Sequence, residues 1–329
     1  MTPQISVILP VYNAQSYLRE SIESMLNQSF ENFELIMIND GSTDDSLKIM
    51  QSYADPRIHI INQDNAGLPI SLNRGINQAR GQYIARQDAD DISLPERLAK
   101  QVAYLDAHPQ CALLGTWAQI LVENTPTDRF LSHPHVNGDI QLKLLFFNCF
   151  VHSSVMIRKS ALEISGLYPE EKEKFPPEDY DLWLRIAKHW QVANLPEVLM
   201  LYRELPSSIS RSKLKIMQER ARLMSLLALK AILPQSTIPK DIASLILAMT
   251  NEPFVAPQSH KAIHSKMLQE LRDTQLKRFD SHQHEIYQSH EDCQKLLNHA
   301  YQKLAAQQIA RYLPFDIIPL LKRIKQWFR

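Results

Sequence analysis

Short apolar runs alternate with segments of helical periodicity along the first hundred residues. Apolar runs of four to eight residues indicate strands buried on both faces, whereas apolar residues three and four apart indicate amphipathic helices. The predicted strands are ISVILP (5–10), FELIMIND (33–40), RIHIIN (57–62) and GQYIARQD (81–88), with helices over 14–26, 43–54 and 68–79. This alternation predicts an α/β fold with a mainly parallel central sheet.

Beyond residue 95 the pattern changes in two steps. Helices are predicted over 95–108, 139–148 and 179–190, a long strand or strand pair over 111–122, and an extended segment over 151–159. After residue 211 the periodicity is helical, over 213–233, 240–250, 258–278, 283–311 and 316–328. We therefore predict an α/β region over 1–210 and a helical C-terminal region over 211–329.

Charge and glycine content divide the chain at the same place. Residues 1–210 contain 17 basic and 26 acidic residues, whereas residues 211–329 contain 19 basic and 10 acidic ones. All seven glycines lie at or before Gly166. Because glycine serves tight turns and close backbone approaches, its absence afterwards favours helices with simple connections.

The composition indicates a globular protein of a reducing compartment. Apolar residues make up 44% and charged residues 22% of the chain, which is ordinary for such a protein. The chain has no run of 18 uncharged apolar residues and no basic leader, so we expect neither a spanning helix nor a signal peptide. Its three cysteines are far apart and lack ligand spacing. We expect a cytoplasmic protein with no nucleic-acid partner.

An acidic run, DADD (88–91), follows the fourth predicted strand. Ligands of parallel sheets bind beyond the carboxyl ends of the strands, where Tyr12, Asp40 and Asn65 are also expected. Asp88 and Asp90, two residues apart, suit Mg²⁺ or Mn²⁺ with bound phosphates, because these cations prefer oxygen ligands. The alternative is a solvated turn in which Asp91 caps the next helix.

Two further acidic segments stand at predicted element ends. In NDGSTDDS (39–46), Asp44 and Asp45 fit the first turn of a helix, whereas Asp40 faces the expected cleft and could accept hydrogen bonds from a base or ribose. In PPEDYDLWLR (176–185), Glu178 and Asp179 stand at a helix entrance, where one acid could be a cap and the other a working base.

These segments, taken in order, resemble the family 2 glycosyltransferases, which have the GT-A nucleotide-sugar-binding fold. The resemblance covers about residues 4–210 and is carried by ISVILPVYN, FELIMINDGSTDDS, NAGLPISLNRGINQARGQYIARQDADD, VHSSVMIRKS, GLYPE, EDYDLWLR and LYRELPSSIS. It implies a nucleotide-binding half over about 1–110 and an acceptor half over about 111–210.

The resemblance also implies a role for each matching residue. Pro10 and Tyr12 would line the nucleotide site, Asp40 would bind the base or ribose, and Asn65 and Gly67 would shape the loop beside the nucleotide. Asp88 would meet the ribose or a metal-bound water, and Asp90 would coordinate Mg²⁺ or Mn²⁺ against the diphosphate. Asp179 would be the general base of an inverting transfer, with its pKa raised by Glu178. His152 either approaches the metal or diphosphate or is a hydrogen-bonded histidine near a strand start. Arg203 and Ser208 are expected in a loop that closes over the site.

The departures from the family pattern restrict the reaction. Leu72 stands where many relatives have an arginine, so no such nucleotide contact carries over, and Arg74 would face elsewhere. The QxxRW-type signature of processive synthases is absent, which favours single additions. The expected donor is a UDP-sugar, and the expected acceptor is a glycan or lipid-linked molecule of surface-polysaccharide assembly.

The C-terminal region leaves several roles open: packing on the catalytic domain, an oligomer interface, or contact with a membrane. The segment YLPFDIIPLLKRIKQWFR (312–329) combines basic and aromatic residues, as helices at anionic membrane surfaces do; the alternative is a helix that docks its apolar stripe on the protein. A peripheral position on the cytoplasmic face of the inner membrane is therefore one expectation.

Three other functions are less consistent with the sequence. A nucleotidyltransferase needs a glycine-rich, basic phosphate loop, and a dinucleotide-dependent oxidoreductase needs G-x-G-x-x-G; LPVYNAQSYL (9–18) has neither. A catalytically inactive nucleotide-sugar-binding or scaffold subunit need not keep Asp40, Asp88, Asp90 and Asp179 together.

Overall fold

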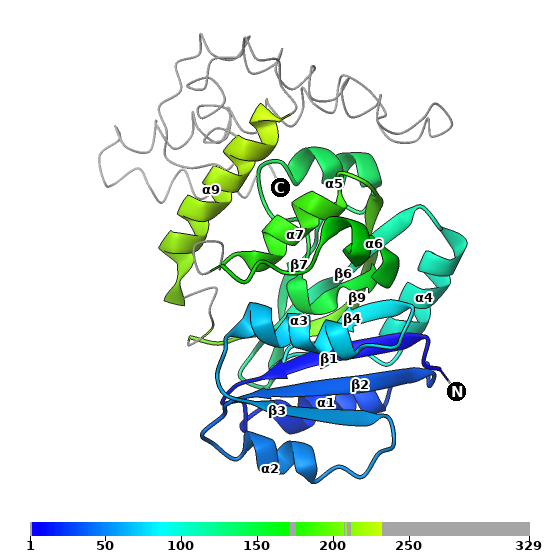
Figure 1. Ribbon diagram of the computed structural model, residues 1–329, viewed down its shortest axis with the longest axis vertical. Coiled ribbons are helices and arrows are strands. Elements are labelled where there is room, and N and C mark those ends of the chain that lie inside the picture. Colours follow the sequence, from blue (N-terminus) through cyan, green and yellow to red (C-terminus); the bar gives the residue numbers. More distant parts are fainter. Residues whose placement is uncertain (1, 172–175, 207, 209–211, 232–329) are drawn as a thin grey trace. The chain divides into compact units, whose positions relative to one another are not determined.

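The computed structural model (Figure 1) describes residues 2–171, 176–206, 208 and 212–231. Four parallel strands come first: β1 (Ile5–Val11), β2 (Phe33–Asp40), β3 (Ile58–Gln63) and β4 (Tyr83–Arg86). They lie in the order β3-β2-β1-β4, with β1 between β2 and β4. These are the four strands predicted from the apolar runs.

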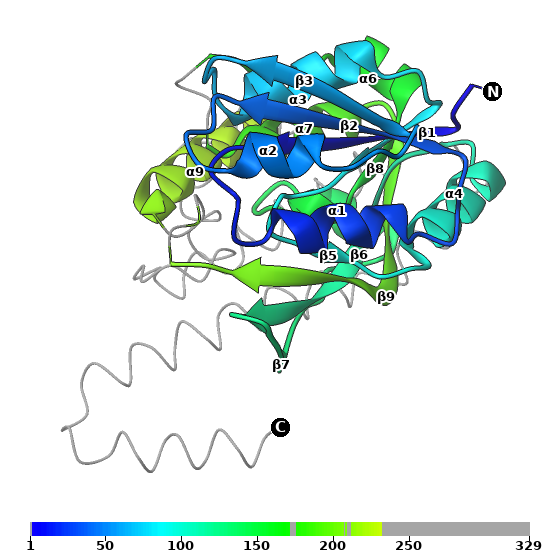
Figure 2. The same ribbon diagram turned by 90° about the horizontal axis from the view of Figure 1, so that it is seen from below.

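Three helices cover the two faces of these strands. They are α1 (Leu18–Leu26), α2 (Ser46–Gln51) and α3 (Leu68–Gln78). Because parallel crossovers are right-handed and the strand order reverses after β3, α1 and α2 share one face and α3 covers the other (Figure 2). Both faces of β1 are therefore buried, which explains its continuous apolar sequence.

Alternate side chains of β1 pack against opposite helices. Val7 and Leu9 belong to one apolar cluster with Leu18 of α1. Ile8 points the other way, and a Cβ added at Gly75 of α3 would come within 2.7 Å of its Cγ2 atom. The glycine lets α3 approach the sheet closely.

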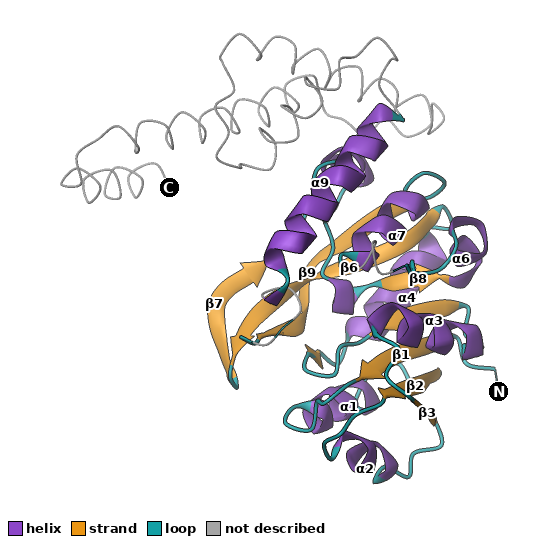
Figure 3. Cartoon of the chain, turned by 60° about the vertical axis from the view of Figure 1, so that its left-hand side comes forward, coloured by secondary structure: helices purple, strands orange, loops and turns teal. Residues whose placement is uncertain are grey.

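The second half of the sheet mixes both directions (Figure 3). Its strands are β5 (Ile92–Ser93), β6 (Cys111–Val122), β7 (Thr125–Leu131), β8 (Met156–Arg158) and β9 (Gln191–Glu204). The order continues β4-β8-β6-β9-β5, and β7 pairs with β6. Only β6 and β9 are parallel here; β8, β7 and β5 are antiparallel to their neighbours. The predicted α/β fold with a mainly parallel sheet is confirmed.

The remaining helices are α4 (Arg97–Ala107), α5 (Asn137–Lys143), the 3₁₀ turn η1 (His152–Ser154), α6 (Lys159–Ser165), α7 (Glu178–Ile186) and α9 (Leu214–Lys230). Within the described residues, the predicted helices are confirmed to within about four residues, except that α5 ends at Lys143 rather than at 148, and α6 was not predicted. Segment 151–159 is not extended throughout, because η1 precedes the short strand β8.

The chain divides into two compact units, one of residues 1–144 and 148–221 and the other of 145–147 and 222–329. The helices predicted over 240–328, and with them the membrane-binding segment 312–329, lie outside the described residues. In the described part of the chain, no helix is long and apolar enough to cross a membrane.

Candidate active site

The acidic run forms a tight turn directly after β4. Asp88, Asp90 and Asp91 each offer a carboxylate oxygen, and these oxygens lie within 4.8 Å of one another. Burial, together with the charge of Asp88, raises the pKa of Asp90 to about 6. A divalent cation with a preference for oxygen ligands would offset this concentration of negative charge. The turn therefore fits the metal site predicted from Asp88 and Asp90.

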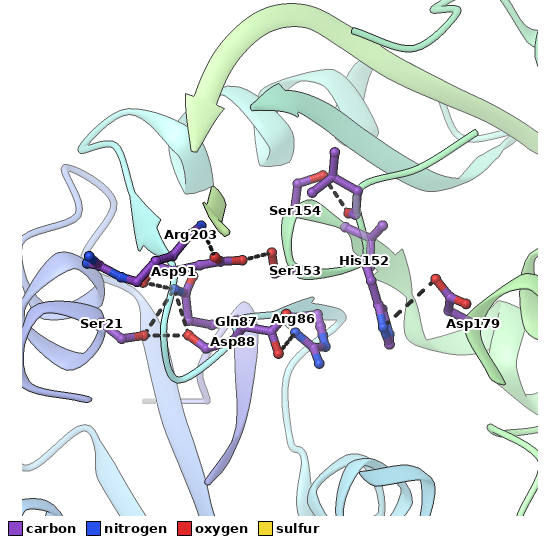
Figure 4. A network of polar contacts seen from close by, with 12 residues as sticks. Ser21, Arg86, Gln87, Asp88, Asp91, His152, Ser153, Ser154, Asp179 and Arg203 are labelled. Atoms are coloured by element: carbon purple, nitrogen blue, oxygen red, sulfur yellow. Dashed lines mark hydrogen bonds and ion pairs between the residues drawn. The ribbon is translucent and has the colours of Figure 1, made fainter. Parts of the chain in front are cut away.

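Buried polar groups hold this turn in place (Figure 4). The Gln87 amide donates to the Asp91 carbonyl oxygen over 2.8 Å and to Ser21 Oγ on α1 over 3.1 Å. Arg97 Nη1 on α4 in turn donates to Gln87 Oε1 over 3.0 Å. The backbone of the turn is thus positioned before any ligand arrives.

Asp91 differs from its neighbours, because its carboxylate is buried and bound by the protein. It accepts hydrogen bonds from the Ser153 hydroxyl of η1 and from the Arg203 backbone N–H of β9, the latter over 2.8 Å. It is 1% exposed and caps no helix. The alternative of a solvated turn with Asp91 as a helix cap is wrong; Asp91 joins the turn to two distant segments.

Arg203 lies in β9, so the expectation that it belongs to a closing loop is wrong. Its guanidinium donates to the Asp90 carbonyl oxygen over 2.8 Å, to Asn124 Oδ1 over 2.7 Å and to Glu20 Oε2 over 2.5 Å. The group also stacks 4.4 Å from the centre of the Tyr17 ring. Arg203 therefore stabilises the backbone of the acidic turn. The Ser208 N–H donates to the Leu205 carbonyl oxygen over 3.2 Å, and a place for Ser208 in a closing loop stays a prediction.

Asp40 closes a loop at the end of β2. Its Oδ1 accepts hydrogen bonds from Gln63 Nε2 over 2.7 Å and from the Ala66 N–H over 2.8 Å, and its Oδ2 accepts one from the Gly67 N–H over 2.9 Å. Asn65 Nδ2 donates to the Asp40 carbonyl oxygen over 3.0 Å. The carboxylate thus fixes the loop that the resemblance assigns to the nucleotide.

The residues that were predicted to bind the nucleotide share one edge of the sheet. Pro10 is buried within β1, and Tyr12, just beyond the strand, is 55% exposed. Strand register pairs Val11 with Asn39, and Asp40 with Gln63, so the carboxyl ends of β1, β2 and β3 are level. Tyr12 and the Asp40 loop are therefore brought to the same edge as the acidic turn.

The second acidic group begins α7. Asp179 Oδ2 accepts a hydrogen bond from Asn148 Nδ2, and Oδ1 accepts one from the Tyr180 N–H, each over 2.7 Å. Burial raises the pKa of Asp179 in spite of these bonds. Burial and the charge of Asp179 raise the pKa of Glu178 to about 8. The main cause of the Asp179 shift is burial rather than repulsion from Glu178.

His152 lies beside this acidic pair. Its Nδ1 is 3.7 Å from Glu178 Oε1 and 3.9 Å from Asp179 Oδ2, and its Nε2 is 3.0 Å from the Tyr168 hydroxyl oxygen. Burial, with a contribution from Arg86, lowers the pKa of His152 well below 6.5, so the ring is neutral. The structure thus shows a hydrogen-bonded histidine just before β8; contact with a metal or diphosphate stays a prediction.

Arg86 is the site residue that the sequence reasoning missed. It closes β4 two residues before Asp88, is 3% exposed, and pairs through Nη1 with Asp88 Oδ1. Its positive charge partly offsets the rise that burial causes in the pKa of Asp90 and in that of Asp179. One signal was available in the sequence: Arg86 is the only basic residue of the predicted strand GQYIARQD (81–88) and stands directly before the acidic run.

The comparisons with known proteins agree with this arrangement. The sequence model of "Glycosyl transferase family 2" matches residues 6–164. An uncharacterized glycosyltransferase of Haemophilus influenzae is 38% identical over 217 residues, covering 61% of this chain and 65% of the relative. The O-antigen biosynthesis glycosyltransferase WbnJ of Escherichia coli is 36% identical over 218 residues, covering 64% of this chain and 83% of the relative.

Solved structures share the fold. S. aureus TarS 1–349 in complex with UDP-GlcNAc superimposes with a TM-score of 0.59 at 17% identity, covering 96% of this chain and 94% of that one. The Pyrobaculum calidifontis mannosyltransferase PcManGT in complex with GDP-Man and Mn²⁺ gives a TM-score of 0.52 at 17% identity, covering 93% and 88%. At these identities the structures show a common GT-A fold. From the sequence relatives, the chain belongs to glycosyl transferase family 2.

Proposed function

We propose that this chain transfers a sugar from a nucleotide-sugar donor, expected to be a UDP-sugar, to a hydroxyl of a glycan or lipid-linked acceptor, with inversion at the anomeric carbon. The observation that carries the proposal is that Arg86 lies between two acidic groups, the turn after β4 and the start of α7 (Figure 4). The turn after β4 is suited to binding a metal ion together with the diphosphate of the donor. The start of α7 is suited to removing a proton from the acceptor. Surface-polysaccharide synthesis is the proposed setting, consistent with the name of the O-antigen relative.

The donor side would be built from the carboxyl edge of the parallel strands. Tyr12 with Pro10, and the loop of Asn65 and Gly67 held by Asp40, would position the nucleoside. Asp88 and Asp90 would hold Mg²⁺ or Mn²⁺, which offsets charge on the diphosphate when bound. The Mn²⁺ complex of PcManGT supports a divalent ion for a protein of this fold.

The acceptor side would be served by Asp179. Asn148 holds its Oδ2 and the Tyr180 N–H holds its Oδ1, so the carboxylate is oriented before the acceptor binds. Its raised pKa makes it a stronger base than an exposed aspartate. Asp179 would take the proton of the acceptor hydroxyl as that oxygen attacks the anomeric carbon.

The test is a thermal-shift screen of UDP-, GDP- and dTDP-sugars with and without Mn²⁺, followed by an assay for released nucleoside diphosphate. Asp90→Ala should lose the Mn²⁺-dependent stabilisation, whereas Asp179→Asn should keep it and lose transfer by about a hundredfold or more. Asp128→Ala, at an exposed position of β7, is the matched control and should behave as wild type.

Two results would oppose the proposal. Wild type that binds a nucleotide sugar but releases no diphosphate with any acceptor fraction would favour an inactive binding subunit. Full activity of Asp179→Asn would remove Asp179 from the role of base.

A further inference from the structure

Three arginines next to the acidic turn are almost completely buried. Arg97 is 0%, Arg203 1% and Arg86 3% exposed. A buried guanidinium is costly unless acceptors take up its N–H groups. The hydrogen bonds of these three side chains therefore show which of them the protein itself satisfies.

The protein satisfies Arg97 and Arg203. Arg97 donates to Gln101 Oε1, Gln87 Oε1, Ser93 Oγ and the carbonyl oxygens of Arg86 and Val155. Arg203 donates to the carbonyl oxygens of Asp90 and Glu123 and to the side chains of Asn124 and Glu20. All three guanidinium nitrogens of each have acceptors, so both side chains are structural.

Arg86 differs from both. Within the described part of the chain, its Nε atom is buried and has no hydrogen-bond partner, whereas its buried Nη1 atom is ion-paired with Asp88 Oδ1. The Nε–H group has lost its water without a replacement, which costs free energy that an incoming acceptor would recover.

The position of Arg86 identifies the acceptor. Figure 4 shows its side chain between Asp88 on one side and His152 and Asp179 on the other. Asp88 belongs to the candidate metal turn and Asp179 is the candidate base, so a donor that reacts here must place its scissile phosphate oxygen between them. A guanidinium presents N–H groups in a planar fork that matches phosphate oxygens.

We propose that Arg86 is a catalytic residue that binds the diphosphate of the donor. The inference rests on the proposed function and adds a residue to it. As transfer proceeds, the bond between the anomeric carbon and the diphosphate oxygen breaks and its electron pair stays on that oxygen. The acceptor oxygen forms the new bond and its proton passes to Asp179. Arg86 offsets the charge that develops on the departing diphosphate.

Calorimetric titration of the full chain tests the assignment, with pyrophosphate plus Mn²⁺ as a base-independent probe and UDP plus Mn²⁺ and GDP plus Mn²⁺ beside it. Arg86→Met should weaken pyrophosphate binding by at least about tenfold, the loss expected for a charge-assisted hydrogen bond. Arg86→Lys keeps the positive charge but lacks the forked N–H groups of a guanidinium, so it should weaken pyrophosphate binding less than Arg86→Met does. Arg129→Lys, at a surface pair with Glu204, is the control and should bind as wild type.

Titration with Mn²⁺ alone separates ligand binding from a structural role. If Arg86 binds phosphate, removing its charge beside Asp88 and Asp90 should leave Mn²⁺ affinity equal or higher. If Arg86 only positions Asp88, Mn²⁺ affinity should fall in Arg86→Met, and that result overturns the proposal.

The outcomes also separate this proposal from the proposed function. Folded Arg86 variants that bind pyrophosphate as tightly as wild type overturn the role of Arg86 and leave the transferase function standing. Wild type that binds none of the three phosphate probes overturns both. Should Arg86→Met fail to fold, Arg86→Lys alone decides, because unchanged pyrophosphate affinity in it contradicts a forked contact.

Discussion

Asp40 allows two roles to be separated experimentally: direct contact with the nucleotide, and support of the loop beside it. The residue is 4% exposed, and its carboxylate already accepts three hydrogen bonds, from Gln63, Ala66 and Gly67. Two of these come from backbone N–H groups that have no other acceptor in the loop. We predict that Asp40 stabilises the protein in the absence of any nucleotide.

The expected magnitude follows from the individual bonds. Asp40→Ala removes all three; at about 1 kcal/mol each for bonds that water can partly replace, the free energy of unfolding should fall by about 3 kcal/mol. For an α/β unit of this size the melting temperature should fall by roughly 6–12 °C. Asp40→Asn keeps Oδ1, which serves Gln63 and Ala66, but sets an amide N–H against the Gly67 N–H. In Asp40→Asn the free energy of unfolding should fall by about half as much as in Asp40→Ala.

The assay is thermal unfolding at pH 7.5 without metal or nucleotide, combined with hydrogen exchange at the Ala66 and Gly67 amides. Both amides should exchange faster in Asp40→Ala. The control is Asp45→Asn, which removes only an exposed pair with Lys48 and should change stability by less than about 0.5 kcal/mol. An Asp40→Ala protein that has the same melting temperature as the control, with both amides still protected from exchange, would refute a stabilising role for Asp40.

Two further predictions concern pH. Hydrogen bonds from Ser6 and Arg80 outweigh burial and hold the pKa of Glu34 below its ordinary value of 4.5, so its stabilisation is present above pH 4.5 and lost as the pH falls through the lowered pKa. Glu34→Gln should therefore be less stable than wild type by about 1–3 kcal/mol at pH 7, and urea unfolding should show this difference shrinking below pH 4.5. Because burial raises the pKa of Asp179, the transfer rate should fall on acidification at a pH above 3.8, the ordinary aspartate value. A rate profile that stays flat down to pH 4 would contradict this assignment of the base.

The parallel strands and the residues at their ends were predictable from the sequence. An apolar run buried on both faces has few other interpretations, and the carboxyl ends of parallel strands meet at one edge whatever the connecting helices do. That is why Asp40, Asn65 and Asp88 could be predicted at one edge of the sheet without knowledge of the strand order, and the register of β1 with β2 and β4 is consistent with that edge.

The long-range contacts that hold Asp91 of the acidic turn were not predictable in the same way. Asp91 is bound by Ser153 and Arg203, which lie 62 and 112 residues further along the chain. The Arg203 contact depends on the antiparallel pairing of β5 with β9, and β5 contains only Ile92 and Ser93. No local pattern in the sequence reports a strand of that length, so a helix cap was the natural reading of Asp91.

The turn η1 explains how the two acidic groups keep a fixed separation. Ser153 binds Asp91 of the metal turn, while its neighbour His152 lies against Glu178 and Asp179 (Figure 4). Ser154 anchors the same turn to β6 by accepting a hydrogen bond from the Thr116 N–H over 3.0 Å. The proposed inverting transfer would require the leaving oxygen and the acceptor oxygen to lie on opposite sides of one carbon, so an error in this separation would lower the rate even with every carboxylate present. Three consecutive residues thus hold the candidate metal turn and the candidate base in register before either substrate binds.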